Sequence, residues 1–165
     1  MDHKELEILH LLEGNARLDI ETIAKMTETT IDEVEQIIQK LEDENIILNY
    51  STVIDWSQVR RYEGVTAMID VKVTPQRGVG FDEVAERIHR FPEVKALYLM
   101  SGAYDLSVTI EAGRMTEIAR FVSEKLSALD SVISTTTHFQ LKTYKHDGVV
   151  FGEKREGDKR IVVSP

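Results

Sequence analysis

The stretch from residue 96 to residue 111 constrains the fold most, because apolar and polar side chains alternate on both sides of a tight turn. After the turn, Leu106, Val108 and Ile110 alternate with polar residues. A period of two on each side of a turn indicates a β-hairpin. Gly102 permits the reversal, since glycine adopts a positive φ without steric cost. The second strand therefore buries one face and presents the other to water or to a partner.

Length and composition limit the classes of protein that this chain can belong to. Its 165 residues, 42% of them apolar, suffice for one or two small domains with real cores. No apolar run approaches the roughly 18 residues of a membrane span, and the polar N-terminus lacks the apolar region of a signal peptide. The chain has no cysteine, which excludes disulfides and cysteine metal sites. These features favour a cytoplasmic protein without membrane contact.

The net charge of −9 is unevenly distributed. Residues 1–60 hold five Lys and Arg against fourteen Asp and Glu, whereas residues 61–165 hold fifteen of each. The excess acid therefore lies in the N-terminal third. Duplex DNA is a polyanion that proteins bind largely through Lys and Arg, so this balance opposes DNA binding by that part of the chain.

The first 45 residues predict a helix, a short helix, a polar turn and a third helix. Asp2 is placed to cap the first helix, Asp19 the second and Thr30 the third. Glu33 follows Thr30 at the spacing of a capping box. The third helix is expected to bury a stripe formed by Ile31, Val34, Ile38 and Leu41. This order is typical of a helix-turn-helix domain, although any three-helix bundle would produce it.

The rest of the chain predicts a second domain with the element order β-α-β-β-α-β. A strand over 65–73 precedes a helix over 81–91, and the hairpin follows. A helix over 114–129 with Met115 facing inward then leads to a long strand over 132–145, with Ile133, Thr135, Thr137, Phe139 and Leu141 on one face. This order is that of the ferredoxin-like fold, an antiparallel sheet with both helices on one face.

The other face of that sheet is expected to be half apolar and open. We expect it to carry Thr66, Met68, Leu97, Leu99, Thr109 and Thr136. An exposed face of this kind on so small a domain predicts a partner sheet and hence a homodimer.

The chain resembles the Lrp/AsnC, or feast/famine, family of bacterial and archaeal regulators. The resemblance lies in Glu5–Leu12, Asn15–Arg17, Ile23–Ala24, Leu41–Ile47, the turn Ser101–Leu106 and the strand Thr137–Lys142. It implies an α+β protein with a winged-helix-like helix-turn-helix DNA-binding domain (1–47) and a strand linker (48–63). A ferredoxin-like βαββαβ domain (64–146) for effector binding and oligomerisation follows, and then a C-terminal tail (147–165). The tail either adds a strand through 161–163 or stays disordered.

The resemblance places DNA contacts on the third helix and the turn before it. The candidates are Thr29, Thr30, Gln36, Gln39 and Lys40. Glutamine side chains can bond adenine edges in a major groove, and helix N-terminal amides can meet a phosphate. The family commonly has basic residues where this chain has Gln36, Ile37 and Gln39, so only Lys40 supplies charge. Loss of direct DNA binding, with the domain kept for sensing or assembly, is the alternative.

The resemblance also implies a small effector, usually a free amino acid, bound near the hairpin turn between dimers that assemble further. The candidate residues are Gly102, Ala103, Tyr104, Asp105, Thr135 and Thr137. A zwitterion suits such a turn, because backbone amides can hold its carboxylate and Asp105 can hold its ammonium group. The competing interpretation is structural: Gly102 forms the turn, Asp105 caps it, Tyr104 packs, and the threonines are ordinary strand residues.

Nothing in the sequence predicts catalysis, a metal site or a cofactor. The five histidines are scattered without metal-ligand spacing. Nucleophile-elbow, P-loop and dinucleotide-binding motifs are missing from the sequence. Some relatives of the family are siroheme decarboxylases, but the histidine-rich final strand associated with them is reduced here to His138. We therefore expect a regulator rather than an enzyme.

Overall fold

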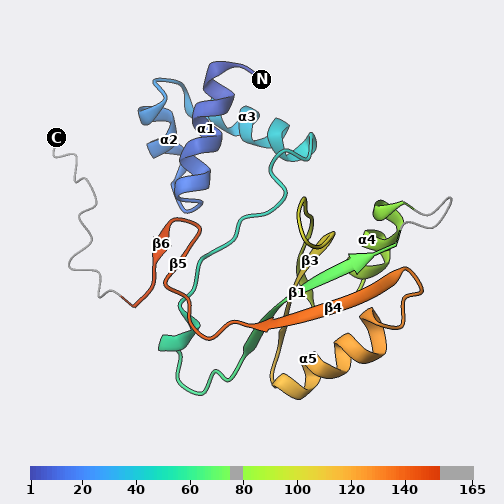
Figure 1. Ribbon diagram of the computed structural model, residues 1–165. Helices are drawn as coiled ribbons and strands as arrows, with labels where there is room; N and C mark the ends of the chain where they lie inside the picture. Colours follow the sequence, from blue (N-terminus) through green and yellow to red (C-terminus); the bar gives the residue numbers. More distant parts are fainter. Residues whose placement is uncertain (75–79, 153–165) are drawn as a thin grey trace. The chain divides into compact units, whose positions relative to one another are not determined.

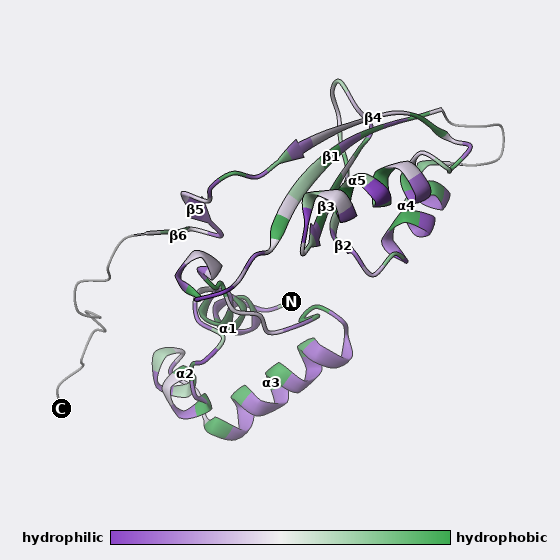
Figure 2. Cartoon of the chain, turned by 90° about the horizontal axis from the view of Figure 1, so that it is seen from below, coloured by the Kyte–Doolittle hydropathy of each residue, from purple (hydrophilic) through white to green (hydrophobic). Residues whose placement is uncertain are grey.

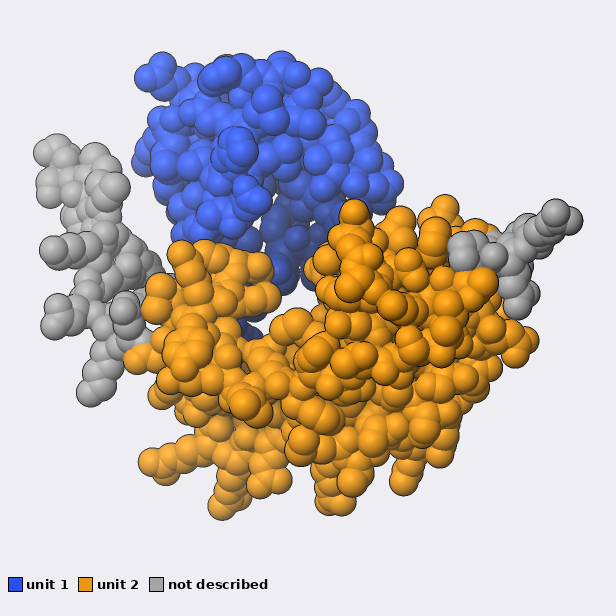
Figure 3. Space-filling model, viewed as in Figure 1, with its two compact units in different colours: residues 1–54 blue, residues 55–165 orange. Residues whose placement is uncertain are grey.

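The computed structural model describes residues 1–74 and 80–152, within two compact units that meet at Ile54 and Asp55 (Figures 1 and 3). Each unit has its own cluster of buried apolar side chains. Residues 75–79, within the loop that the sequence predicts over 74–80, and the strand considered at 161–163 lie outside the described residues. No helix in the described ranges is long and apolar enough to cross a membrane.

Unit 1 contains three helices, and each is preceded by the capping residue that the sequence predicts. The helices are α1 (His3–Gly14), α2 (Ile20–Met26) and α3 (Ile31–Asp43). The side chains of Asp2, Asp19 and Thr30 accept hydrogen bonds from the backbone three residues onward, at 2.8, 2.8 and 3.2 Å. Such bonds satisfy amide donors that a helix leaves free at its N-terminus. Local sequence therefore fixes where these helices begin.

The three helices of unit 1 pack around one apolar cluster. Its buried members are Ile8, Leu12, Ile23, Ala24 and Val34. In α3, Leu41 is also buried and Ile38 is half-buried, as the stripe predicts. Ile31 is 44% exposed, which corrects its expected burial: it is the first residue of α3 and lies outside the cluster. Hydrophilic residues cover most of α3 in Figure 2, with hydrophobic ones at intervals.

The strand expected in the linker is not formed. Between the end of α3 and Val65, the only regular element is a short 3-10 helix, Trp56–Gln58. Residues 48–55 have no partner strand in the described chain, and an unpaired strand leaves its backbone N–H and C=O groups without hydrogen bonds. The helix-turn-helix accordingly has no wing strand among the described residues. Trp56, the first residue of the 3-10 helix, stacks on Tyr62 with 4.6 Å between ring centroids.

Unit 2 is built on the predicted four-stranded antiparallel sheet. Its strands are β1 (Val65–Val73), β2 (Val94–Leu99), β3 (Leu106–Ala112) and β4 (Val132–Phe139), in the spatial order β2-β3-β1-β4. All four are labelled in Figure 2. Strand β1 is central and pairs with β3 on one side and β4 on the other. With a helix after β1 and another after β3, this is the ferredoxin-like arrangement.

Helices α4 (Phe81–His89) and α5 (Met115–Phe121) both pack on one face of the sheet. Val84 and Ile88 of α4, and Ile118 and Phe121 of α5, join the buried side chains of β1 and β3 in one cluster. Helix α5 continues as a π-helix, Val122–Leu126, so the two together cover most of the helix predicted over 114–129. Met115 is 52% exposed, contrary to expectation, because it is the first residue of α5.

The last strand of the sheet is shorter than predicted and irregular. Lys72 pairs with Ser134, but Val73 pairs with Val132, so Ile133 is an extra residue in β4. Val132 therefore packs against the core and Ile133 is 64% exposed, which corrects its predicted position. The strand ends at Phe139, and Leu141 beyond it is 94% exposed rather than aligned with the buried face.

A small hairpin that the sequence analysis missed follows the sheet. It consists of β5 (Lys145–His146) and β6 (Val149–Val150), joined through Asp147 and Gly148. Both joining residues have positive φ, 44° and 77°. An Asp-Gly pair is a strong signal for such a two-residue turn, so the sequence did contain the information.

The face of the sheet away from the helices is open in the single chain. Met68 of β1 lies between Thr109 and His138, and Asp70 lies between Ser107 and Thr136. Met68 is 45% exposed and Tyr98 of β2 is 60% exposed. Leu97 and Leu99, both expected on this face, lie on the helix side instead: Leu97 pairs with the buried Val108 and packs against the core, and Leu99 pairs with Leu106. We call the side chains of Thr66, Met68, Asp70, Tyr98, Ser107, Thr109, Thr136 and His138 the open face.

Candidate nucleic-acid and effector sites

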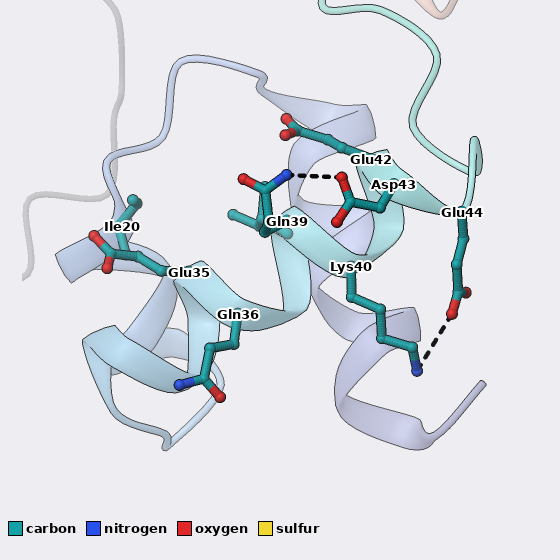
Figure 4. Close-up of a pocket in the computed structure, with 9 residues that line it drawn as sticks. Ile20, Glu35, Gln36, Gln39, Lys40, Glu42, Asp43 and Glu44 are labelled. Atoms are coloured by element: carbon teal, nitrogen blue, oxygen red, sulfur yellow. Dashed lines mark hydrogen bonds and ion pairs between the residues drawn. The ribbon is translucent and has the colours of Figure 1, made fainter.

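The exposed side of α3 carries the side chains expected to face DNA. Gln36, Gln39 and Lys40 line an open depression of about 730 Å³ (Figure 4). Gln39 donates from Nε2 to Asp43 Oδ1 at 2.9 Å, so its amide is partly engaged within the helix. The other polar residues of the depression are acidic: Glu35, Glu42, Asp43 and Glu44. The surface of α3 that would face a DNA groove therefore carries side-chain amides and carboxylates, and Lys40 is its one cation.

The turn before α3 is held by its two threonines. Thr30 Oγ1 accepts the backbone N–H of Glu33 and begins α3. Thr29 Oγ1 accepts from Lys4 Nζ at 3.2 Å and donates to the Glu33 carboxylate. Because Glu33 is turned toward Thr29, the reciprocal half of the predicted capping box is replaced by this side-chain contact. Both hydroxyls therefore have structural partners in the chain.

Lys40, the only basic residue of α3, is paired with a carboxylate of α1. Its Nζ lies 2.6 Å from Glu5 Oε1 and 4.0 Å from the carboxylate of Glu44. The Glu5 side chain is only 7% exposed, whereas that of Lys40 is 51% exposed. The hydrogen bond from Lys40 holds the pKa of Glu5 below its ordinary value, and the same bond raises the pKa of Lys40. The sequence analysis did not single out Glu5, whose partner lies 35 positions away.

Unit 1 remains strongly acidic when its charges are counted over residues 1–54. Four Lys and Arg oppose thirteen Asp and Glu, a balance of −9. Some of these carboxylates serve the fold: Asp2 and Asp19 cap helices, and Glu5 binds Lys40. Asp32 and Glu33 lie in the first turn of α3, where negative charge stabilises the helix dipole. Fold requirements thus account for part of the acidity.

The turn between β2 and β3 joins the hairpin to β1. Gly102 has φ +150°, a backbone conformation that other residues rarely adopt, and a Cβ there would meet nothing within 4 Å. The turn therefore requires glycine for its backbone rather than for space. Met100 N donates to Asp105 O at 2.7 Å and closes the turn.

Asp105 fastens this turn to the end of β1. Its backbone N donates to Val71 O at 3.0 Å, and its Oδ2 accepts the backbone N–H of Val73 at 2.8 Å. The structural interpretation expected Asp105 to cap the turn, whereas its carboxylate satisfies an amide at the end of a central strand. The Asp105 side chain is half-buried, and this bond uses only one of its two oxygens.

The other predicted effector residues have different surroundings. Ala103 is exposed and Tyr104 is half-buried. Thr135 pairs with Val71 and Thr137 with Ile69, so both threonines are half-buried on the helix side of the sheet. Thr135 and Asp105 thus flank the same residue of β1 from its two neighbouring strands, while Thr137 lies one pair further along. The structure brings together the turn, the end of β1 and Thr135.

Three of the five histidines each lie beside one carboxylate. His138 Nε2 lies 2.9 Å from Asp70 Oδ2 on the open face, and His10 and His146 each contact one carboxylate. Within the described ranges, no three His, Asp or Glu side chains are grouped to hold a metal ion.

A helix-turn-helix unit followed by a ferredoxin-like unit defines a class of two-domain regulators. The model of the Lrp/AsnC ligand binding domain matches residues 66–150. An uncharacterized HTH-type transcriptional regulator of Bacillus subtilis, YugG, is 65% identical over 165 residues, covering 100% of this chain and 99% of the relative. The chain belongs to the Lrp/AsnC family. It is a transcriptional regulator of the helix-turn-helix type and not an enzyme.

More distant relatives and solved structures agree with this fold. The regulator LysM of Saccharolobus solfataricus is 27% identical over 144 residues, covering 87% of this chain and 96% of the relative. A transcriptional regulator of Neisseria meningitidis, solved as an L-Met complex, has a TM-score of 0.71 at 23% identity, covering 88% and 93% of the two chains. AsnC of E. coli has a TM-score of 0.67 at 19% identity, covering 88% and 95%.

Proposed function

We propose that this protein is a cytoplasmic regulator that binds duplex DNA and responds to a free amino acid. The observation that carries the proposal is the family's ligand-binding domain, joined in one chain to a helix-turn-helix unit. The Neisseria meningitidis neighbour was solved with L-Met, which supports an amino acid as the class of effector.

DNA is bound in this proposal through α3 and the turn before it. Gln36 and Gln39 are exposed and reach base edges, where glutamine bonds adenine. Thr29 and Thr30 place the N-terminal amides of α3 toward a phosphate. The acidic charge of unit 1 keeps the DNA affinity of a single helix-turn-helix unit low. An assembly of dimers raises the affinity by letting several of these units, here called heads, bind one duplex together.

The effector is bound at the turn between β2 and β3. Backbone amides around Gly102 and Ala103 hold the carboxylate of the amino acid, and the second oxygen of Asp105 holds its ammonium group. Tyr104 forms a wall, and Thr135 and Thr137 complete the site from β4.

Homodimers form through the open face, and an amino acid bound between dimers changes how they associate. Met68 and Tyr98 are too exposed for a sheet face in a stable single chain, which supports a second copy as the cover. Effector binding and DNA binding are then linked through the spacing of the heads.

The proposal is tested by two measurements on the full chain. A thermal-shift screen of the twenty amino acids should identify a ligand that raises the melting temperature. Gel shifts on DNA duplexes selected from a random pool should give specific complexes whose affinity falls steeply with salt and changes with that ligand. A stabilising ligand without a specific shift at any salt would instead support a sensing or assembly subunit, which the acidity of unit 1 favours. Without a ligand or a shift, the proposal is wrong.

A further inference from the structure

The further inference concerns Lys40, the only cation that α3 can offer to DNA. Around it, the exposed side of the helix carries Asp32, Glu35 and Asp43. If Lys40 contacts a phosphate, it supplies all the charge neutralisation that α3 makes. Its place in the structure is therefore decisive for how the head binds a polyanion.

Glu5 holds Lys40 within an arrangement that has a partner for each carboxylate oxygen. Glu5 Oε2 accepts the backbone N–H of Asp2 at 2.7 Å, completing the capping box of α1, and lies 3.8 Å from the N-terminal ammonium. Glu5 Oε1 accepts from Lys40 Nζ at 2.6 Å. If Lys40 left, a carboxylate that is 7% exposed would lose the closer of its two cationic neighbours and keep only the N-terminal ammonium at 3.8 Å. Removing one partner of a buried charge pair is costly.

A DNA phosphate would have to compete with this carboxylate. Lys40 would exchange one anionic oxygen for another, so the new contact gains little, while Glu5 loses its closest cation. A counterion leaves the DNA only where a lysine neutralises a phosphate, so Lys40 releases none while it stays on Glu5. The raised pKa of Lys40 and the lowered pKa of Glu5 agree with mutual stabilisation of the two charges.

We propose that Glu5 withholds Lys40 from DNA, so that α3 meets the duplex without an available positive charge. Lys40 is then a positioning residue that joins α3 to the start of α1. This inference rests on the proposed function, because it concerns how the same head binds DNA. It also provides a means of tuning: a change at Glu5 alone releases a phosphate contact that the chain already carries.

The test compares Glu5→Gln with Glu13→Gln in the full chain. Glutamine at position 5 keeps the capping-box acceptor, because this motif accepts Gln as well as Glu, but it removes the charge that holds Lys40. Glu13 lies on the same helix with its side chain 82% exposed, so Glu13→Gln removes the same charge without touching Lys40. Affinity for a duplex selected by the wild-type protein is measured across a salt series.

We expect Glu5→Gln to bind more tightly than Glu13→Gln. One additional phosphate contact steepens the slope of log affinity on log salt by about 0.9. Taking 1 M salt as the reference, that contact raises the DNA affinity about fivefold at 0.15 M salt. Adding Lys40→Met to Glu5→Gln should abolish this gain. Equal affinities for the two glutamine variants would overturn the inference. So would a gain that survives the added Lys40→Met.

A readout without DNA separates this inference from the proposed function. Acylation of Lys40 by an amine-reactive ester, followed by mass spectrometry, should be faster in Glu5→Gln than in the wild-type protein and in Glu13→Gln. Unchanged Lys40 reactivity would show that Glu5 does not hold the lysine and would overturn the inference. If instead the reactivity rises but no protein, the wild type included, binds DNA, the proposed function fails and the withheld lysine stands.

Discussion

At the scale of single residues, Asp105 serves the fold and is also the proposed ligand for an ammonium group. Its Oδ2 accepts from Val73 N at 2.8 Å, so removing the carboxylate also removes the partner of a strand amide. Leaving such an amide unsatisfied costs about 1 to 3 kcal/mol. Asp105→Ala therefore confounds folding with binding, and a substitution that keeps an oxygen acceptor is required to separate them.

Asp105→Asn is that substitution. The asparagine carbonyl can still accept from Val73 N, so the melting temperature should change little, whereas Asp105→Ala should lower it. The loss of the negative charge should weaken amino-acid binding by roughly 10- to 100-fold, the usual range for a hydrogen bond to a charged group. Isothermal titration calorimetry with the ligand from the thermal-shift screen measures this. Wild-type affinity in Asp105→Asn would restrict Asp105 to its structural role.

The family resemblance singled out Asp105, and local patterns identified the helix caps, but neither could identify a partner that is distant in the sequence. Caps such as Asp2, Asp19 and Thr30 were predictable, because a cap acts on an amide three residues away. The pair between Glu5 and Lys40 was not, since it depends on how α1 and α3 pack. The amide that Asp105 binds, 32 positions away in β1, was hidden for the same reason.

At the scale of elements, the type and order of helices and strands followed from the sequence, and their irregularities did not. The alternation over 65–73 predicted β1 residue for residue. The extra residue at Ile133 could not be read, because Val132 and Ile133 are both β-branched and either can face the core. The strand predicted after α3 failed because pairing requires a partner strand, which local pattern cannot supply.

The contact between β2 and the π-helix after α5 gives a prediction at this scale. Glu93, just before β2, pairs with Lys125 of that π-helix, and Lys125 Nζ lies 5.2 and 5.7 Å from the ring centroids of Phe91 and Phe121. The hydrogen bond from Lys125 lowers the pKa of Glu93 from its ordinary value of 4.5. A lowered pKa in the folded state means that the pair stabilises the fold above pH 4.5 and loses this effect as the pH falls through the lowered value.

Glu93→Gln should therefore reduce the free energy of unfolding at neutral pH and flatten its decline in acid. The expected loss is about 0.5 to 1 kcal/mol, because the pair is partly exposed. Urea unfolding followed by circular dichroism from neutral pH to below pH 4.5 measures the difference from the wild type, which should shrink toward the acid end. Lys125→Met should show the same trend. A difference that stays constant across this range would contradict the assignment.

At the scale of the whole molecule, two units with separate cores are joined by a segment without strand structure. Two clusters could be anticipated, because the helical and alternating patterns occupy different parts of the chain. The content of the open face could be anticipated only partly, because both edges of β2 carry apolar side chains and the sequence did not show that Leu97 faces the core. Met68 and Tyr98 remain as its largest exposed apolar side chains.

Met68→Glu tests whether a second copy covers this face. Met68 lies on the central strand between Thr109 and His138, and the open face carries no Lys or Arg, so a partner sheet would bury the new carboxylate without either residue opposite it. Burying an unpaired charge costs several kcal/mol, so dimer affinity should fall about hundredfold or more, which sedimentation velocity measures. Met115→Glu is the matched control: Met115 is similarly exposed, at 52%, but lies at the start of α5 on the opposite side of the sheet. If Met68→Glu sediments like the wild type, or if Met115→Glu dissociates equally, the subunits associate through some other surface.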